Sequence, residues 1–270
     1  MLQDCRQSQE AGPAMALLKV LLLLGLGAAV SSVSLQKRII GGKTCRDDDR
    51  QYHVKVFATN QTSDKFCGGS LISSQWVLTA AHCWQSGPGW VNEAHVGVHP
   101  VSAPTLVYRI SRHEFYVDSN GRVHDIMLLK LPVKVTTIQP IRLPDCPDTL
   151  LLGTKVEFAG HGSTQVGLFN KRLHQFPNEL QCAELKIAKH EKLELTLAKQ
   201  KSFKRTFQEW YSVSSSKREA SHGDSGGGLV FNNRLYGVCA FVGDPAYAFR
   251  DPIGFMDVCY YKQWIDDTIR

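Results

Sequence analysis

The sequence has no internal repeats and no low-complexity tracts, and its excess of positive charge is small. Because the sequence shows no internal repeats, a solenoid or another array of repeated units is not expected. Lysine and arginine number 31 against 25 acidic residues, and residues 1–38 carry +2 of the resulting +6, which leaves +4 for the rest of the chain. A charge this small supports weak attraction to anionic surfaces and does not require a nucleic-acid partner.

Residues 14–34 read AMALLKVLLLLGLGAAVSSVS, and the leucine core of this stretch is too short to span a bilayer. A single lysine, a run of leucines and then small residues are typical of a secretory signal peptide, which we place at residues 1–32. An uncleaved membrane anchor is disfavoured because no basic flank follows at once. Met15 is a more ordinary start than Met1, since it removes the polar segment before the signal. We therefore expect a secreted, extracellular protein with no membrane partner.

The chain of 270 residues has the apolar fraction (43%) and charged fraction (21%) of a globular protein, so a full hydrophobic core is available. Its length suits two ordinary domains or one large all-β unit. Export places the cysteines in an oxidising compartment. Seven remain after the signal, which predicts three disulfides and one free thiol without assigning the pairs. They are Cys45, Cys67, Cys83, Cys146, Cys182, Cys239 and Cys259.

Short apolar runs alternate with turn signals through most of the chain. Regular short strands at this spacing favour a sandwich or barrel over alternating strands and helices. Residues 229–231 and 235–238 flank Asn232, Asn233 and Arg234, which is the signature of a β-hairpin. The other expected strands are residues 53–57, 69–72, 76–79, 107–110, 126–131 and 155–158.

Two stretches have helical character. Residues 184–201 are rich in lysine and glutamate, and their leucines give only partial amphipathicity. The C-terminal end has the better pattern, because its larger side chains recur at i, i+3, i+4, i+7 and i+8 from Tyr261 to Ile269. We therefore predict a mostly β protein with a C-terminal helix.

A dibasic pair, Lys37 and Arg38, precedes the apolar and glycine-rich segment IIGG at 39–42. This arrangement indicates a proteolytic processing point, with an ordinary charged linker as the alternative. We place an activation propeptide at residues 33–38 and one functional domain at residues 39–270, a length of 232 residues.

The pentapeptide GDSGG at 223–227 places Ser225 between glycines, on backbone that can bend sharply and approach a substrate closely. A serine hydroxyl is a weak nucleophile until a base removes its proton. His82, in the sequence TAAHC, offers such a base. Asp125 opens a strongly apolar run, where a buried carboxylate needs a partner such as an imidazole N–H. These three residues indicate nucleophilic catalysis.

The order His82, Asp125, Ser225 in TAAHC, DIMLLK and GDSGG resembles that of the trypsin-like serine proteases of the chymotrypsin fold. The likeness extends from IIGG at 39–42 to the C-terminal Arg270. It implies two antiparallel six-stranded β-barrels with the active site between them, followed by a C-terminal α-helix. It also implies that residues 39–270 form a serine endopeptidase domain that acts on protein or peptide substrates.

The resemblance gives each catalytic residue a role. His82 accepts the proton of Ser225 and passes it to the leaving amine, while Asp125 orients the imidazole and stabilises the imidazolium. The backbone N–H groups of Gly223 and Ser225 form the oxyanion hole. The complete set argues against the alternative from another class, a catalytically silent homologue that acts as a binding protein.

The resemblance also implies a zymogen. Cleavage after Arg38 frees the amino group of Ile39, which inserts, pairs with Asp224 and orders the oxyanion hole. A buried ammonium–carboxylate pair carries a desolvation penalty that the uncut chain avoids. The expected partners are then an activating protease and the substrate, with a serpin-type inhibitor as a further candidate, and we expect a monomer.

The resemblance assigns the disulfides as well, and leaves Cys239, in an apolar strand, as an inert buried thiol. Residues 98–104 have no convincing counterpart of the calcium loop of trypsins, so we expect neither a metal nor a cofactor. Asn60 begins a glycosylation sequon in a predicted surface loop. The implied pairs are Cys45–Cys182, Cys67–Cys83 and Cys146–Cys259.

The substrate pocket departs from the family pattern on its first wall. Glu219 stands six positions before Ser225, where trypsin itself has an aspartate. Ser221 stands where the family has a cysteine bonded across the pocket rim, and no partner cysteine lies between Cys239 and Cys259. The pocket wall therefore lacks that disulfide.

The opposite wall changes too, because Ala240, Phe241 and Val242 replace Ser-Trp-Gly and Ile253 takes the place of a glycine deeper in the pocket. The larger side chains predict a narrower pocket, and a buried Glu219 behind them is costly unless it is paired. Two interpretations stay open: a constricted pocket for small apolar side chains, or a remodelled pocket that still uses Glu219 for basic ones. The sequence favours the first. The filled pocket and the missing disulfide also support the silent homologue.

Overall fold

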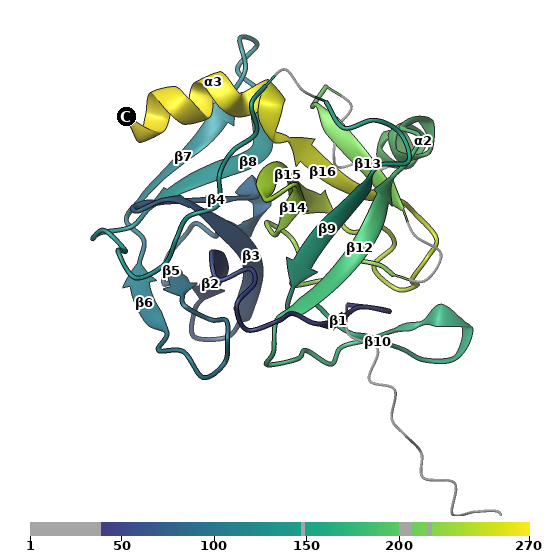
Figure 1. The fold of residues 1–270 in the computed structure, drawn as a ribbon, viewed down its shortest axis with the longest axis horizontal. Helices are drawn as coiled ribbons and strands as arrows, with labels where there is room; N and C mark the ends of the chain where they lie inside the picture. Colours follow the sequence, from purple (N-terminus) through teal and green to yellow (C-terminus); the bar gives the residue numbers. More distant parts are fainter. Residues whose placement is uncertain (1–38, 147–148, 200–206, 215–217) are drawn as a thin grey trace, which may run out of the picture. The chain divides into compact units, whose positions relative to one another are not determined.

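The computed structural model describes residues 39–146, 149–199, 207–214 and 218–270, which all lie in one compact unit spanning Gln36–Arg270. The predicted signal peptide, the propeptide and Arg38 lie outside the described residues. Strands form most of the regular structure, and α2 (Glu191–Lys199) and α3 (Val258–Ile269) accompany them (Figure 1). The prediction of a mostly β protein with a C-terminal helix is confirmed.

The first half of the described chain forms an antiparallel sheet of seven strands in the order β6-β5-β2-β3-β4-β8-β7. β6 and β7 lie at the two ends of this order although only residues 110 and 111 separate them in the chain, so the sheet curls into a half-barrel. Its strands are β2 (His53–Thr59), β3 (Asp64–Ser73), β4 (Trp76–Thr79), β5 (Val91–Val96), β6 (Leu106–Arg109), β7 (Arg112–Val117) and β8 (Val123–Lys130).

The second half closes on itself. Pairing runs β9-β12-β13-β16-β15-β14 and returns to β9, which makes a six-stranded barrel, and β1 (Lys43–Thr44) pairs with one end of β12. A small hairpin of β10 (Gln165–Val166) and β11 (Arg172–Leu173) leaves the barrel between β9 and β12. The barrel strands are β9 (Lys155–Gly160), β12 (Gln181–Ile187), β13 (Trp210–Ser214), β14 (Gly228–Phe231), β15 (Arg234–Phe241) and β16 (Ile253–Asp257).

The prediction of a helix over residues 184–201 is wrong for its first part. These residues begin inside β12, where burial alternates and Leu185 points inward while Glu184 points to solvent. Alternation with a period of two is the mark of a strand with one buried face, so the charged residues that suggested a helix form the outer face of the barrel. The helix begins only at Glu191, and two of its leucines are buried.

The C-terminal helix α3 links the two halves. Its apolar face is buried, as the periodicity predicts, and Asp257 caps its first turn by accepting the N–H of Cys259 at 2.9 Å. The hydroxyl of Tyr261, a residue with no exposed surface, hydrogen-bonds Nδ1 of His124 in β8 at 2.7 Å. The helix therefore holds the half-barrel against the closed barrel, and Figure 1 shows it beside β7 and β8.

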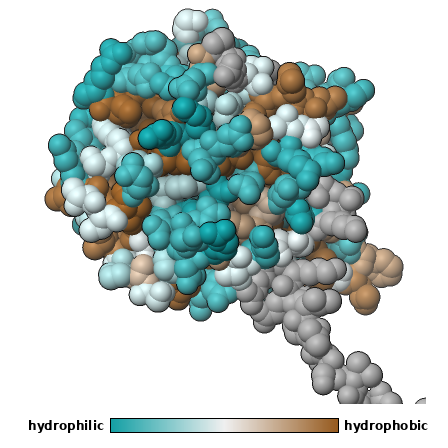
Figure 2. Space-filling model, viewed as in Figure 1, coloured by the Kyte–Doolittle hydropathy of each residue, from teal (hydrophilic) through white to brown (hydrophobic). Residues whose placement is uncertain are grey.

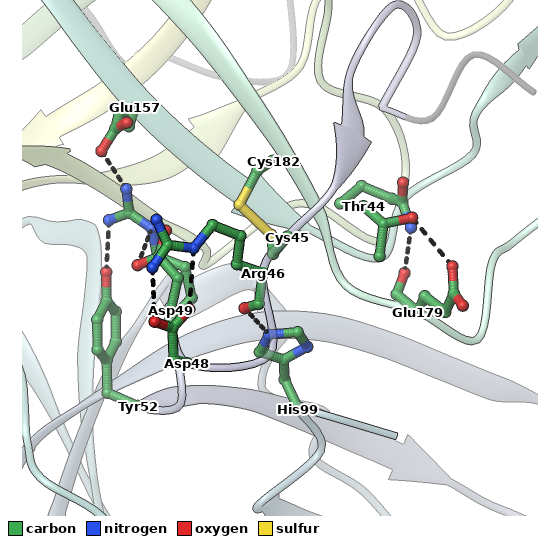
Figure 3. Close-up of a disulfide and its surroundings, with 12 residues drawn as sticks. Thr44, Cys45, Arg46, Asp48, Asp49, Tyr52, His99, Glu157, Glu179 and Cys182 are labelled. Carbon is green, nitrogen blue, oxygen red and sulfur yellow. Dashed lines mark hydrogen bonds and ion pairs between the residues drawn. A yellow bond between two sulfur atoms is a disulfide. The ribbon is translucent and has the colours of Figure 1, made fainter. Parts of the chain in front are cut away.

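Disulfides fix the connections between these elements. Cys45–Cys182 joins the segment after β1 to β12 (Figure 3). Beside it, Arg46 pairs with Asp48, and the Arg46 carbonyl accepts a hydrogen bond from Nε2 of His99 at 2.8 Å. The disulfide holds the N-terminal segment on the closed barrel, and the hydrogen bond from His99 ties it to the half-barrel as well. Cys67–Cys83 and Cys146–Cys259 are also formed, so the three pairs are those that the resemblance implies.

Hydrophilic residues cover most of the face in Figure 2, with smaller hydrophobic groups between them. One such group lies where Figure 1 places the β10–β11 hairpin, and Leu168 and Phe169 of this hairpin are 84% and 91% exposed. Among the described residues, no helix is both long enough and apolar enough to cross a bilayer.

Candidate active site

His82 lies in the 3₁₀ turn Ala81–Cys83, close after β4. The disulfide Cys67–Cys83 joins this turn to β3, so the histidine is held from two neighbouring strands. The two sulfur atoms beside the imidazole belong to that disulfide, so this group of potential ligands offers no thiolate to a metal ion.

His82 and Asp125 form a hydrogen-bonded pair. Nδ1 of His82 lies 2.9 and 3.0 Å from the two carboxylate oxygens, and the His82 backbone N–H donates to Oδ1 at 2.9 Å. Asp125 is 4% exposed in β8, and its own N–H donates to Oε1 of Gln208 at 2.7 Å. Because the carboxylate accepts the proton on Nδ1, the other ring nitrogen keeps a lone pair and can act as a base.

Ser225 lines the same cleft as His82 and Gly223, a space of about 410 Å³ that Phe66 and Phe176 also line. The carbonyl of Ser225 accepts the N–H of Gly68 at 2.7 Å, which ties the serine turn to β3. The nucleophile candidate, supplied by the closed barrel, therefore shares one cleft with the base candidate, supplied by the half-barrel.

The glycines around Ser225 are required by close approach. Gly223 and Gly226 have φ of 93° and 81°, in the left-handed region that side chains other than glycine rarely adopt. A Cβ on Gly223 would lie 2.5 Å from the ring of Phe66, and one on Gly226 would lie 2.2 Å from the carbonyl oxygen of Gly68. The GDSGG motif thus encodes a tight turn pressed against the half-barrel.

Asp224 has no exposed surface and lies directly beside the serine. Its carboxylate accepts N–H bonds from Gly162 at 2.7 Å and from Ser221 at 2.8 Å. Burial raises the pKa of Asp224 to about 7, because the ionised form loses its hydration, and the two N–H donors oppose that rise. A Cβ on Gly162 would lie 2.2 Å from Oδ2, so the cradle around this carboxylate needs glycine.

Ile39 is also fully buried, in an apolar cluster that includes Ala220 and Cys239. The carbonyl of the next residue, Ile40, accepts the N–H of Glu219 at 3.1 Å. The start of the predicted mature chain is therefore packed against the serine loop. Burial raises the pKa of the Cys239 thiol well above its ordinary value, which keeps this free cysteine in its unreactive form.

Glu219, the predicted pocket carboxylate, is 2% exposed and is paired with Arg172. One terminal nitrogen of Arg172 lies 2.5 Å from Oε1 of Glu219, and the N–H of Phe249 donates to Oε2. Burial raises the pKa of Glu219, while the guanidinium and the Phe249 N–H oppose the rise because they stabilise the carboxylate. The negative charge of Glu219, which the sequence predicts at the base of the pocket, is neutralised by Arg172 of the same chain.

The remaining predicted pocket residues come from β15, from the residue that follows it, and from β16. Ala240 and Phe241 are buried at the end of β15, Val242 follows them, and Ile253 is buried at the start of β16. None of them lines the cleft shared by His82 and Ser225, and Glu219 and Ile253 line a different cleft of about 360 Å³.

Sequence reasoning missed Arg172. A buried glutamate requires a cation, but Arg172 stands 47 positions before Glu219 in a segment without any recognisable motif. Only the requirement for a partner could have prompted a search among the arginines, and that requirement does not select one of them.

The sequence pattern of the trypsin family matches residues 39–265. Kallikrein-11 of Mus musculus is 30% identical to this chain over 98% of the chain and 95% of its own length, and kallikrein-2 of Homo sapiens is 30% identical over 92% and 96%. The beta-fibrinogenase mucrofibrase-3 of Protobothrops mucrosquamatus is 29% identical over 94% and 96%. The solved structure of neuropsin, a serine protease expressed in the limbic system of mouse brain, superposes with a TM-score of 0.67 at 27% identity, covering 85% of this chain and 99% of neuropsin.

Proposed function

Since the chain belongs to the trypsin family of serine proteases, we propose that it is a secreted serine endopeptidase made as a zymogen. The observation that carries the proposal is the cleft in which Ser225 accompanies His82, with Asp125 hydrogen-bonded to the far side of the imidazole. A histidine oriented by a buried carboxylate beside a serine is the arrangement that activates a hydroxyl for attack on an amide.

In the proposed reaction, Nε2 of His82 takes the proton of Ser225 while the serine oxygen attacks the carbonyl carbon of the scissile peptide bond. Asp125 stabilises the resulting imidazolium through the contact that it already makes with Nδ1 at 2.9 Å. The imidazolium then gives its proton to the leaving amine, which releases the first product. Water repeats the sequence on the acyl-enzyme, and the serine is regenerated.

The negative oxygen that develops during attack needs donors that are already in place. We assign this role to the backbone N–H groups of Gly223 and Ser225. The tight turn supports the assignment, because its glycines let the backbone pack directly against the half-barrel. One such donor contributes about 10²–10³ in rate.

We place activation at the bond between Arg38 and Ile39, after a signal peptide at residues 1–32 and a propeptide at residues 33–38. Cleavage would turn the peptide nitrogen of Ile39 into an ammonium group. Pairing of that group with Asp224 would lower the pKa of the buried carboxyl, because an adjacent cation stabilises the ionised form. The full burial of Ile39 and Asp224 near the same loop supports this assignment.

Export through the secretory pathway also makes Asn60 a candidate for glycosylation. Its side-chain oxygen accepts the N–H of Thr62 at 2.9 Å in the turn between β2 and β3. The partners that the proposal requires are a protein or peptide substrate and the protease that cuts after Arg38, and a serpin-type inhibitor suits an enzyme that acts outside the cell.

Active-site labelling tests this function. The purified full chain is cut after Arg38, treated with a fluorophosphonate probe and digested, and the modified residue is mapped by mass spectrometry. We expect the label on Ser225, no label on the uncut chain, and none on Ser225→Ala. Absence of label on Ser225 in a cut and folded protein would refute the proposed endopeptidase function.

A second candidate function is a catalytically silent homologue that acts by binding, and Arg172 favours it because this side chain fills the predicted substrate pocket. The same labelling experiment separates the two functions, since a silent homologue stays unlabelled after the cut.

A further inference from the structure

The side chain of Arg172 occupies the region that the sequence assigns to substrate recognition. Its Nε donates to the carbonyl of Asp244 at 2.9 Å, and one terminal nitrogen donates to the carbonyl of Ala220 at 3.0 Å. The other terminal nitrogen contacts the carbonyl of Val242 at 3.0 Å and the carboxylate of Glu219 at 2.5 Å. All three guanidinium nitrogens are therefore engaged by the walls and the base of the predicted pocket.

We propose that Arg172 is a specificity-determining residue, which takes the place of a basic substrate side chain beside Glu219 and so restricts the pocket to small apolar side chains. The proposal deepens the proposed protease function and rests on it. It selects one of the two interpretations of the pocket that the sequence leaves open. It predicts that the enzyme discriminates against substrates with lysine or arginine before the scissile bond.

Electrostatics supports the exclusion of basic side chains. The side chains of Arg172 and Glu219 are 2% and 3% exposed, so their charges compensate each other away from water. A substrate cation that entered beside them would lose its hydration without finding a free counter-charge, which is costly in a poorly hydrated site. To reach the carboxylate it would have to displace Arg172, and removing one partner from a buried ion pair is costly.

The backbone delivers Arg172 to this place. Its N–H donates to the carbonyl of Ala246 at 2.9 Å, and the N–H of Ala248 donates to the carbonyl of Asn170 at 2.9 Å. Lys171 forms an antiparallel bridge with Tyr247 between these two bonds. Main-chain hydrogen bonds thus dock the β10–β11 hairpin along the loop of residues 242–252, which we call the rim loop, and the guanidinium is held in position before any substrate arrives.

The same contacts explain how the pocket keeps its shape without the family's rim disulfide. One wall contributes the carbonyl of Ala220, the other contributes those of Val242 and Asp244, and the guanidinium bridges them. Arg172 therefore also has a structural effect, so a test of its role in specificity needs a measurement that loosening of the pocket alone would not change.

Equilibrium binding of benzamidine supplies the first measurement, because this flat aromatic cation resembles the end of an arginine side chain. Binding is measured by calorimetry on the full chain carrying Ser225→Ala, cut after Arg38, so that catalysis is not needed. We expect Arg172→Ala to bind benzamidine at least tenfold more tightly than the chain with Arg172. The gain should vanish in Arg172→Ala/Glu219→Ala, which lacks the carboxylate.

Lys171→Ala is the matched control. It removes a positive charge from the neighbouring position of the same hairpin, but Lys171 is exposed and only its backbone meets the rim loop. We expect its benzamidine affinity to equal that of the parent. Equal affinity in the parent and in Arg172→Ala would overturn the proposal.

Substrate selectivity supplies the second measurement, on the cut chain with Ser225 intact. The ratio of kcat/KM for arginine to that for valine, at the residue before the scissile bond, should rise at least 100-fold in Arg172→Ala. A purely structural role would lower both rates together and leave the ratio unchanged, which would overturn the proposal. If Arg172→Ala does not fold, the parent protein decides: preference for arginine or lysine overturns the proposal, and preference for small apolar residues supports it.

The two proposals fail separately. If the cut chain is not labelled by the fluorophosphonate probe, the proposed protease function is wrong. If Arg172→Ala nevertheless binds benzamidine more tightly than the parent, the proposed role of Arg172 still stands. A labelled enzyme that prefers arginine keeps the function and loses the assignment.

Discussion

Two pairs of side chains meet at the serine loop, residues 219–227, and they stand in opposite physical conditions. In the pair of His82 and Asp125, the histidine side chain is 31% exposed and lines an open cleft. In the pair of Arg172 and Glu219, both side chains are almost completely buried and every guanidinium nitrogen has an acceptor. In the pair of His82 and Asp125, the second ring nitrogen of the histidine is available to accept a proton. In the pair of Arg172 and Glu219, both charged groups are already engaged and cannot bind a substrate.

The proposed nucleophile and the predicted pocket carboxylate therefore have different surroundings although they lie in one loop. Ser225 is pressed against the half-barrel by tight glycine turns, which conserve its geometry whatever the pocket contains. Glu219 lies only six positions earlier, but its carboxylate is paired with Arg172 of the β10–β11 hairpin. Four experiments test this contrast.

The largest expected effect comes from the nucleophile. Ser225→Ala in the cut chain should lower kcat by about 10⁶, because the hydroxyl that forms the covalent intermediate is gone. Single-turnover kinetics on a peptide substrate would measure the loss. His82→Ala should cause a similar loss, and the double variant should be little worse than either, since the two residues act as a unit. Additive losses would contradict a shared catalytic role.

Asp125→Asn should lower kcat by about 10⁴, because an amide at this position favours the wrong histidine tautomer. Steady-state kinetics on the cut chain would show it. Asp118→Asn is the matched control, since Asp118 also hydrogen-bonds a histidine, His124, at 3.3 Å. That variant should keep its kcat, and an equal loss in both variants would point to unfolding instead of chemistry.

Arg172→Ala should lower the free energy of unfolding by about 3–5 kcal/mol, because it strands the Glu219 carboxylate in a buried site. Chemical denaturation of the uncut chain would measure this change. Arg172→Ala/Glu219→Ala should lose less, since no unpaired charge remains. The exposed Lys171→Ala should stay within about 0.5 kcal/mol of the parent. A loss in the double variant as large as that in Arg172→Ala would show that packing, and not the stranded charge, dominates.

An effect of comparable size is expected in the dependence of stability on pH. The pKa of Asp224 in the folded chain is raised to about 7 by burial, above its ordinary value of 3.8, so the folded state binds more protons than the unfolded state between these values. The free energy of unfolding of the uncut chain should therefore fall as pH rises from about 4 to about 7, by at most about 1.4 kcal/mol per pH unit from this group.

Denaturation of the parent and of Asp224→Asn across this range would isolate the contribution of Asp224, because the asparagine does not titrate while Glu219 titrates in both proteins. Cutting after Arg38 should flatten the slope of the parent, since the new ammonium would lower the pKa of Asp224. An unchanged slope after the cut would argue against the pairing of Ile39 with Asp224.

Local patterns in the sequence predicted the C-terminal helix and eight of the sixteen strands of the described residues. The segment 76–79 is β4 as predicted, and the hairpin at residues 229–238 is formed by β14 and β15. The failure at residues 184–187 has a physical cause: a barrel strand with a charged outer face has nearly the composition of an amphipathic helix, and only the register within β12 separates the two. Pairing between distant strands is invisible to a local pattern.

The sequence by itself determined the chemistry that this chain can offer. Short motifs predict Ser225, His82 and Asp125 as catalytic residues, because a nucleophile, a base and a tight glycine turn impose strict demands on residue type. The tertiary structure alone decided what stands in the predicted pocket. A buried carboxylate can pair with any cation that the fold places beside it. Here the cation is Arg172, which stands 47 positions before Glu219 in a hairpin that is docked by main-chain hydrogen bonds. Backbone hydrogen bonds can form whatever the side chains are, so no sequence motif predicts that contact.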